Sequence, residues 1–478
     1  MASPDSLQDP RADARFEQLR PMAGARAAQA LETLVREAPD AQLCRINVYD
    51  FAERAGLSET EALDLFVHAS RLGLFDLSWN LLCPGCGGVL DAAASLRHLD
   101  KETYYCALCA GGYEPTLDEM VEVSFTVNPG VRRIAAHAPD DLPFWEYQRL
   151  VFWSSGIHLP EGEAFEAVKA EVILEAEEIP AGGRCILNVQ LPGAFVILFD
   201  AVTHTAFFLD CKGEATRDRR ELTVVFSESH PPTGTRELRP GPLRLTLENR
   251  TGRRVLPGLY LANDALHHML GHRKRFLTAR DLLSTQTFRD HFRAETLDLN
   301  QRLRITSLTF LFTDLKGSTE LYERVGDLAA YDLVRDHFRA LNEAVAAEGG
   351  AVVKTIGDAV MATFPSPERG LRAALRMREA IADLNAARGA EDLLVKIGLH
   401  EGPCLAVTLN ERLDYFGQTV NIAARVQGLA VDRAICATEP VVGHPGAAGL
   451  LQERGLRPAP RRAALKGVRE AMMVFEIP

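Results

Sequence analysis

Two aspartates and a lysine in the last third of the chain have the spacing of a phosphate-handling site. Asp314 ends an apolar run that predicts a buried strand, and Asp358 stands with Gly357 at a predicted hairpin turn, just after Lys354. Carboxylates that converge on one point suit Mg²⁺ or Mn²⁺, because these ions prefer oxygen ligands shared with substrate phosphates. After Asp314, residues 317–319 open a predicted helix whose first backbone N–H groups suit phosphate oxygens. The sequence therefore predicts a metal-dependent site for a phosphorylated substrate.

A second polar set lies on a turn and a helix further along the chain. Asp414 precedes Gly417, and Asn421 and Arg425 lie four residues apart on the helix predicted after that glycine. Side chains four residues apart share one face of a helix. The apolar residues around Asn421 argue against a helix surface that only meets water.

These residues lie in three motifs that resemble the catalytic domain of class III nucleotidyl cyclases, and the adenylate type in particular. The resemblance runs from Ile305 to Pro478 and is carried by residues 311–319, 353–362 and 414–425. It covers roughly the last third of the chain.

The resemblance implies a role for each polar residue. Lys354 would donate to N1 of adenine, and Asp414 would accept from the 6-amino group. In guanine the donor and the acceptor are exchanged at these two positions, N1 and the 6-substituent, so Lys354 and Asp414 together favour adenine. Asn421 would orient the ribose, and Arg425 would stabilise charge on the α-phosphate. The positions implied for two Mg²⁺ or Mn²⁺ ions per active site are Asp314, Leu315 and Asp358, and those implied for the triphosphate are Gly317, Ser318, Thr319 and Lys466.

The function implied is that of an adenylate cyclase, which converts ATP to 3′,5′-cyclic AMP and pyrophosphate. By resemblance, the metal carboxylates of one site and its base-reading residues come from different protomers, so the implied partner is a second copy in a homodimer. The alternative is a non-catalytic signalling protein whose cyclase-like domain binds nucleotide or a partner. Loss of Asp314, Asp358 or Arg425 would favour that alternative, and all three are present. The signature of diguanylate cyclases is absent, because Gly349–Gly350 run into Ala351–Val352.

The elements that must position these residues alternate between strands and helices. A helix with apolar residues from Leu328 and Tyr331 to Val345 ends at Gly349–Gly350, a natural C-terminal cap. The expected order is strand 306–313, this helix, strands 351–356 and 359–364, helix 368–385 and strand 394–400. The order βαββαβ predicts a ferredoxin-like core.

Four of the nine cysteines form two tight pairs far from the cyclase-like motifs. Each Cys-x-x-Cys pair can place two thiolates on one tetrahedral ion, and the spacing is that of a zinc ribbon. A ribbon zinc usually replaces a hydrophobic core, so we expect a structural Zn²⁺ and no chemistry there. The expected ligands are Cys83, Cys86, Cys106 and Cys109.

The N-terminal region resembles a winged-helix module. Ser58 is an N-cap with Glu61 three residues later, which predicts a capping box at the start of the second helix of a helix–turn–helix. That helix carries Glu59, Glu61 and Asp64 against Arg71, and the chain has a net charge of −12, so both argue against nucleic acid as a partner. We expect this region to dock a protein or small-molecule regulator.

The whole chain is predicted to be a multidomain α+β protein. Its 478 residues, 47% hydrophobic and 25% charged, are ordinary for globular domains. There is no apolar run of the ~18 residues that a membrane helix needs, so we expect a cytoplasmic protein without a membrane span. The predicted segments are a disordered tail (1–14), a winged-helix-like module (15–80), a zinc ribbon (81–125), a loop-rich linker (126–165), an antiparallel β-sandwich (166–262), a helical linker (263–303) and the cyclase domain (304–478).

Overall fold

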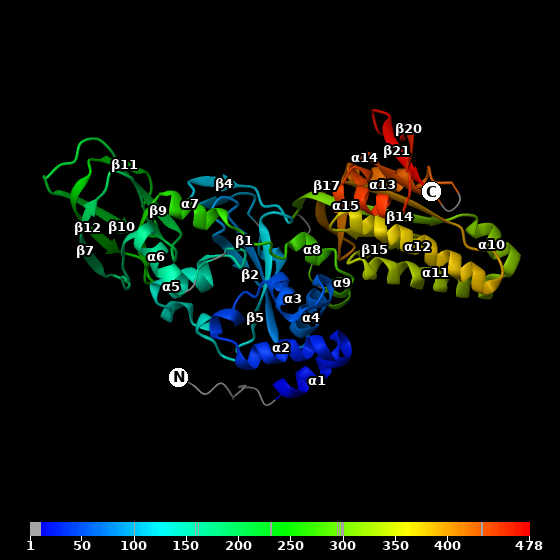
Figure 1. The fold of residues 1–478 in the computed structure, drawn as a ribbon, viewed down its shortest axis with the longest axis horizontal. Coiled ribbons are helices and arrows are strands. Elements are labelled where there is room, and N and C mark those ends of the chain that lie inside the picture. Colours follow the sequence, from blue (N-terminus) through cyan, green and yellow to red (C-terminus); the bar gives the residue numbers. More distant parts are fainter. Residues whose placement is uncertain are drawn as a thin grey trace. The chain divides into compact units, whose positions relative to one another are not determined.

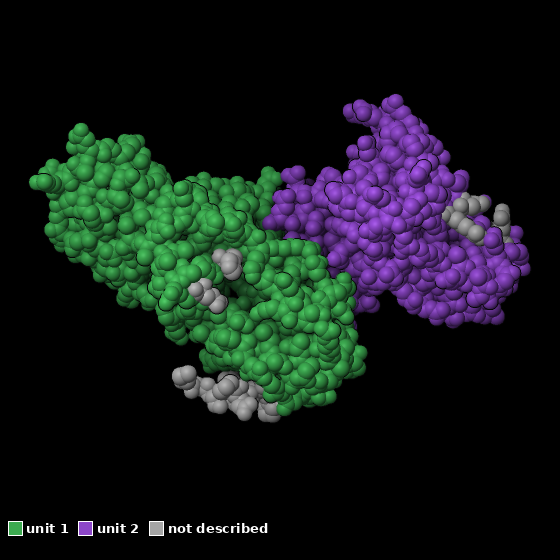
Figure 2. Space-filling view, viewed as in Figure 1, with its two compact units in different colours: residues 1–94, 101–115, 120–277 green, residues 95–100, 116–119, 278–478 purple. Residues whose placement is uncertain are grey.

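The computed structural model describes most of the chain in two compact units. The described residues are 11–99, 101–157, 159–160, 162–229, 232–293, 295, 297, 301–431 and 434–478, without the side chains of residues 318–320, 322 and 327. Unit 1 comprises residues 1–94, 101–115 and 120–277, and unit 2 comprises residues 95–100, 116–119 and 278–478 (Figure 2). Among the described residues, no helix combines the length and the apolarity that a bilayer crossing requires.

Unit 2 is built on one eight-stranded sheet. Its strands are β14 (Leu303–Leu315), β15 (Ala351–Ile356), β16 (Ala359–Phe364), β17 (Val395–Leu409), β18 (Arg412–Phe416), β19 (Ile435–Thr438), β20 (Ala459–Ala463) and β21 (Met472–Ile477). They run in the order β15-β16-β14-β17-β19-β21-β20, and β18 pairs with β17. The first four strands have the element order and strand order expected for the βαββαβ core. The predicted bounds of β15 and β16 are confirmed.

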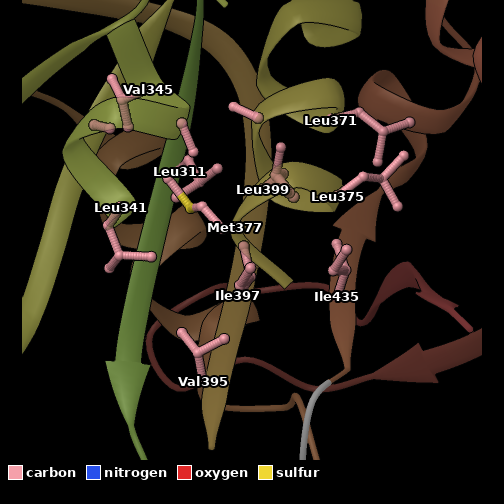
Figure 3. Packing of buried hydrophobic residues seen from close by; sticks show 14 of the residues in the cluster. Leu311, Leu341, Val345, Leu371, Leu375, Met377, Val395, Ile397, Leu399 and Ile435 are labelled. Atoms are coloured by element: carbon pink, nitrogen blue, oxygen red, sulfur yellow. The ribbon is translucent and has the colours of Figure 1, made fainter. Parts of the chain in front are cut away.

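Helices pack on one face of this sheet. They include α11 (Asp327–Ala347), α12 (Pro367–Arg388) and α15 (Pro445–Glu453), whose apolar residues share one buried cluster with the strands (Figures 1 and 3). Figure 3 shows Leu341 and Val345 of α11, and Leu371, Leu375 and Met377 of α12, around the strand residues Leu311, Val395, Ile397, Leu399 and Ile435. The remaining helices of unit 2 are α8 (Ala279–Leu283), α9 (Gln286–His291), α10 (Ser318–Val325), α13 (Gln418–Gln427) and α14 (Glu439–Val442).

The predicted apolar stripe of α11 is wrong at its start. Leu328 is 84% exposed and Tyr331 is 66% exposed, whereas Ala330 and Leu333 are buried. The buried face of the helix is therefore rotated relative to the predicted one.

Unit 1 begins with four helices and a small sheet. The helices are α1 (Ala12–Ala23), α2 (Ala25–Glu37), α3 (Val48–Ala55) and α4 (Glu59–Arg71), and the strands are β1 (Phe75–Leu82), β2 (Val89–Ala93) and β5 (Val121–Val127). The capping box at Ser58 and Glu61 is confirmed. α1 begins inside the segment predicted as a disordered tail, of which residues 1–10 lie outside the described residues. The winged-helix interpretation of these elements stays a prediction.

Short elements connect this part of unit 1 to two further sheets. They are the hairpin β3 (Tyr104–Cys106) and β4 (Gly111–Tyr113), the single turns η1 (Asp40–Leu43), η2 (Leu96–His98), η3 (Ala135–His137), η4 (Pro139–Asp141) and η5 (Gln148–Phe152), and helices α5 (Phe144–Tyr147), α6 (Gly162–Val172) and α7 (Asp264–Gly271). Of these, η2 lies in a segment that unit 2 contains.

The two further sheets enclose a common apolar cluster. One sheet has the order β10-β12-β7 and the other the order β11-β9-β8-β13-β6. The strands are β6 (Ile173–Ala176), β7 (Arg184–Leu191), β8 (Phe195–Asp200), β9 (Thr205–Cys211), β10 (Arg220–Phe226), β11 (Thr235–Leu238), β12 (Gly241–Asn249) and β13 (Pro257–Leu261). The prediction of a purely antiparallel sandwich is wrong, because β10 pairs with β12 and β11 pairs with β9 in parallel.

Two short segments from the cysteine-rich region belong to unit 2. Asp118 is buried there, and its carboxylate accepts hydrogen bonds from the backbone N–H groups of Thr306 (3.0 Å) and Ser307 (3.1 Å). These residues lie at a bulge in β14, where the register with β17 shifts between Ile305 and Leu308. Asp118 thus supplies acceptors for backbone donors that the strand ladder leaves free.

Candidate active site

Two carboxylates meet at the end of the central strand. Asp314 lies near the end of β14, and Asp358 lies in the turn between β15 and β16, where Gly357 has a φ of 64°. The backbone N–H of Val360 donates to the hydroxyl of Thr313 (3.0 Å), which holds the turn beside the end of β14. Burial and the charge of Asp358 raise the pKa of Asp314, and Lys396 opposes this shift.

The donor set at this point fits a cation. The Oδ2 atom of Asp358 is buried and has no hydrogen-bond partner among the described residues. A buried acceptor without a donor is costly, and two carboxylates close enough to perturb each other repel. A divalent ion with oxygen ligands would remove both penalties. The side chain of Leu315 is buried in the core, so only its backbone can contribute to such a site.

Sequence reasoning missed a histidine close to these carboxylates. His337 of α11 is fully buried, and neither ring nitrogen has a hydrogen-bond partner among the described residues. Burial lowers the pKa of His337 to about 4, and the charge of Asp358 opposes that shift. Its position three residues after Val334 and four before Leu341 was a usable signal, because it places a polar ring on an apolar helix face.

The predicted base-reading residues are in contact. The Nζ atom of Lys354 on β15 lies 2.5 Å from Oδ2 of Asp414 on β18. The side chain of Lys354 is 41% exposed and that of Asp414 is 10% exposed. The other carboxylate oxygen of Asp414 accepts from the backbone N–H of Tyr415 (2.8 Å). A donor and an acceptor are therefore held side by side at the surface.

Helix α13 presents the other predicted residues. Asn421 is exposed and Arg425 is half-buried on this helix. The helix approaches β17 closely, because a Cβ at Gly398 would overlap the backbone nitrogen of Gln427. The guanidinium of Arg425 lies beside Gly467, next to the exposed Lys466. The structure thus brings Lys466 to the neighbourhood of Arg425.

The predicted phosphate loop is described only in part. Gly317 has a φ of 67°, and its carbonyl accepts from the backbone N–H of Leu321 (2.9 Å) at the start of α10. The backbones of Ser318 and Thr319 begin this helix, and their side chains lie outside the described residues.

The four predicted zinc ligands come together in unit 1. Their sulfur atoms lie within 4.8 Å of one another, with 3.7 Å between Cys83 and Cys109 and between Cys86 and Cys106. A disulfide needs a distance of ~2.0 Å, whereas thiolates arranged tetrahedrally at ~2.3 Å from one zinc ion lie ~3.8 Å apart. The spacing therefore fits a shared metal ion.

Residues 10–290 match a family of unknown function (DUF5939), and residues 301–448 match the adenylate and guanylate cyclase catalytic domain. An adenylate cyclase of Anabaena cylindrica is 29% identical over 36% of this chain and 36% of its own length. An uncharacterized protein of Mycobacterium tuberculosis is 42% identical over 26% of this chain and 31% of its own length. The chain thus spans about a third of the length of these two relatives.

Guanylyl and adenylyl cyclases of other groups are also similar to part of this chain. Retinal guanylyl cyclase 1 of Mus musculus is 30% identical over 25% of this chain and 12% of its own length. The crystal structure of the adenylyl cyclase CyaB from P. aeruginosa is 23% identical, covers 37% of this chain and 96% of that chain, and superposes with a TM-score of 0.33. The chain belongs to the DUF5939 family and carries a class III adenylate/guanylate cyclase catalytic domain in its C-terminal part.

Proposed function

We propose that the protein is an adenylate cyclase that converts ATP to 3′,5′-cyclic AMP and pyrophosphate. The observation that carries the choice of ATP is the contact between Lys354 and Asp414. The lysine donates and the carboxylate accepts, which complements N1 and the 6-amino group of adenine and mismatches guanine. Guanine would place a donor against a donor and an acceptor against an acceptor at this pair, which is the basis for rejecting it.

Asp314, the backbone of Leu315 and Asp358 would hold two Mg²⁺ or Mn²⁺ ions. When bound, these ions would lower the pKa of the attacking 3′-hydroxyl and neutralise negative charge on the leaving pyrophosphate. The unpartnered Oδ2 of Asp358 and the mutual repulsion of the two carboxylates support this assignment.

The residues of the chain then orient the substrate for one displacement. Lys354 and Asp414 fix the base, and Asn421 fixes the ribose so that its 3′-hydroxyl faces the α-phosphate. The 3′-oxygen forms a bond to the α-phosphorus, the bond to the bridging oxygen breaks, pyrophosphate leaves and the hydroxyl proton passes to solvent. Arg425 stabilises the charge that develops on the α-phosphate. The triphosphate would lie against Gly317, Ser318, Thr319 and Lys466.

A homodimer would complete the site. Ile356 is 52% exposed and Phe416 is 63% exposed, and they follow Lys354 and Asp414 on their strands. Large apolar side chains exposed beside a binding site favour burial against a partner. Each chain carries both halves of the site, so an isologous dimer would form two equivalent sites. The reaction would take place in the cytoplasm, where ATP is abundant.

The N-terminal region would regulate this activity in response to a protein or small molecule. Its cysteine cluster would hold a structural Zn²⁺, which the sulfur spacing supports. A structural metal supplies folding free energy to a region with a small core.

Cyclic-nucleotide production by the purified full chain with Mn²⁺ tests the proposal. We expect cyclic AMP from ATP, far less cyclic GMP from GTP, and no product from the Asp358→Ala variant. Cyclic GMP as the main product would refute the adenine assignment. No product from either nucleotide would favour the alternative, a cyclase-like domain that only binds nucleotide or a partner.

A further inference from the structure

Helix α9 contacts both strands that carry the base-reading residues. The Oε1 atom of Gln286 accepts a hydrogen bond from the backbone N–H of Val352 on β15 (2.8 Å). The Nη2 atom of Arg289 donates to the backbone carbonyl of Leu413 on β18 (2.8 Å). One short helix therefore bonds to the backbone close to Lys354 and directly before Asp414.

The contact on β15 lies at a bulge. Val352 pairs with Ala362 of β16, but Lys354 pairs with Met361, so Val353 is an extra residue between them. The position of a bulge decides which face of the sheet the following side chains occupy. A shift of one residue would turn Lys354 away from Asp414. The bond that the backbone N–H of Val352 donates to Gln286 fixes the strand on the near side of this bulge.

The contact on β18 acts on the residues on either side of Asp414. Arg289 binds the carbonyl before it, and its charge also acts on Tyr415 after it, where it opposes the burial that raises the pKa of Tyr415 to about 12. The backbone N–H of Tyr415 in turn donates to Asp414 (2.8 Å). The Nη1 atom of Arg289 is buried without a partner among the described residues, which is a cost that the fold tolerates at this position.

The two hydrogen bonds lie beside a pocket of about 180 Å³. It is lined among others by Gln286, Arg289, Val352, Val353 and Leu413. Phe288, which lies between the two bonding residues, is buried and anchors α9 by packing. Packing is not directional, so the two hydrogen bonds are the contacts that can fix the register of the strand backbones.

We propose that Gln286 and Arg289 are positioning residues that set the selectivity for adenine by fixing the backbone on which Lys354 and Asp414 lie. This inference rests on the proposed function for its kinetic consequence, and on the hydrogen bonds and the bulge for its structural part. Neither residue touches the base; each acts through the backbone.

The test uses substitutions that separate the acceptor at position 286 from its bulk. Gln286→Leu removes the acceptor for Val352, and Gln286→Glu keeps it. Both are made on an Asp290→Ala background, because Gln286 also donates to Asp290 (3.0 Å) and a second carboxylate there would repel the first. Asp290→Ala alone is the matched control that removes this second contact. Arg289→Leu and Arg289→Lys form the corresponding pair at the other contact. The readouts, on the full chain, are kcat/KM for ATP relative to GTP and amide hydrogen exchange of residues 351–356.

We expect Gln286→Leu to lower the preference for ATP about tenfold, mainly through KM, and to speed exchange in residues 351–356 about tenfold. Gln286→Glu and Asp290→Ala should stay close to wild type in both readouts. Arg289→Leu should lower the preference for ATP more than Arg289→Lys does. Unchanged preference and exchange in Gln286→Leu would overturn the proposal, as would a lower unfolding midpoint with an unchanged preference.

The structural part of this proposal can be tested even if the proposed function is wrong. If the wild-type chain makes no cyclic nucleotide, the proposed function fails, and the exchange readout alone decides. Faster exchange in Gln286→Leu but not in Gln286→Glu would then support the positioning role, and equal exchange in both would overturn it.

Discussion

A Cβ atom at Gly467 would lie 3.3 Å from Nη1 of Arg425, so the absence of a side chain at one residue makes room for the guanidinium of the other. Gly467 also has a φ of 75°, a backbone conformation that L side chains rarely adopt. The loop after β20 and helix α13 therefore meet at a point where any larger residue would press on Arg425.

Substitution of this glycine should affect catalysis more than stability. We expect Gly467→Ala to lower kcat about tenfold, and Arg425→Ala to lower it ~10²- to 10³-fold, the usual loss for a transition-state donor. Gly455→Ala is the matched control, since Gly455 has a φ of 65° and open space around its Cα. Both alanines should cost ~1 kcal/mol of backbone strain, measured by denaturant unfolding. Equal kcat in the two alanine variants would contradict the contact with Arg425.

Removal of the charge at Asp358 should abolish metal-dependent stabilisation. Asp358→Asn relieves the repulsion that raises the pKa of Asp314, so the metal-free variant should be at least as stable as wild type. In the wild type, Mn²⁺ at ~100 times its Kd should add ~2.7 kcal/mol, seen as a higher Tm. Asp383→Asn, at an exposed position of α12, should keep this shift. A full Mn²⁺ shift in Asp358→Asn would refute the metal assignment.

Substitution of Lys354 and Asp414 should convert the nucleotide preference from ATP to GTP. The class III family usually has Glu and Cys at these positions in guanylate cyclases, so Lys354→Glu with Asp414→Cys should lose at least ~10²-fold in kcat/KM for ATP and gain activity with GTP. Asp414→Asn alone keeps an acceptor oxygen and should lose less than Asp414→Ala. Product assays with each nucleotide measure both effects. Retention of the ATP preference in the double variant would show that the pair does not read the base.

The cysteine cluster should bind one zinc ion per chain. Cys106→Ser should abolish zinc binding, measured by elemental analysis of the purified protein, and should lower the unfolding midpoint. Cys185→Ser, which alters a half-buried thiol outside the cluster, should keep the metal. Zinc retained in Cys106→Ser would argue for another site.

Acid should destabilise the fold in part through His400. This buried ring hydrogen-bonds Thr438 (2.7 Å), and burial lowers its pKa from 6.5 to about 4. The unfolded state therefore binds the proton first, and this contribution to stability is present above pH 6.5 and is lost as the pH falls toward 4. Two and a half pKa units correspond to ~3 kcal/mol.

The His400→Gln variant should show a smaller loss of stability between pH 7 and pH 5 than wild type, measured by denaturant unfolding at each pH. His337 adds a similar dependence, so some loss should remain. His98→Gln, at an exposed position, should follow the wild-type curve. Identical curves for wild type and His400→Gln would show that His400 does not contribute to the loss of stability in acid.

The catalytic core was predictable because local patterns and long-range contacts agree there. The Gly357–Asp358 turn fixes the hairpin of β15 and β16, and the resemblance to class III cyclases implies that Lys354 and Asp414 read the same base. The four cysteines were equally readable, since two Cys-x-x-Cys turns have few other uses in so long a chain.

Other features depend on information that the spacing of residues does not hold. Alternation of apolar residues reports which face of a strand is buried, not its direction, so the parallel pairing of β10 with β12 was missed. The exposure of Leu328 and Tyr331 required knowledge of which face of α11 meets the sheet. The contacts of Gln286 and Arg289 join segments that are distant in the sequence, and a glutamine on a short helix carries no local sign of them.

The boundary between the two family matches does not coincide with the boundary between the two compact units. Residues 95–100, 116–119 and 278–290 lie within the match to the DUF5939 family, yet they belong to the compact unit that contains the cyclase sheet. Asp118 is one such residue, and it supplies acceptors to β14 itself. A protein engineer who cuts the gene at residue 300 would not isolate a minimal enzyme but would discard part of its scaffold. A fusion that replaces the N-terminal region would need to keep residues 95–100 and 116–119 together with the cyclase domain.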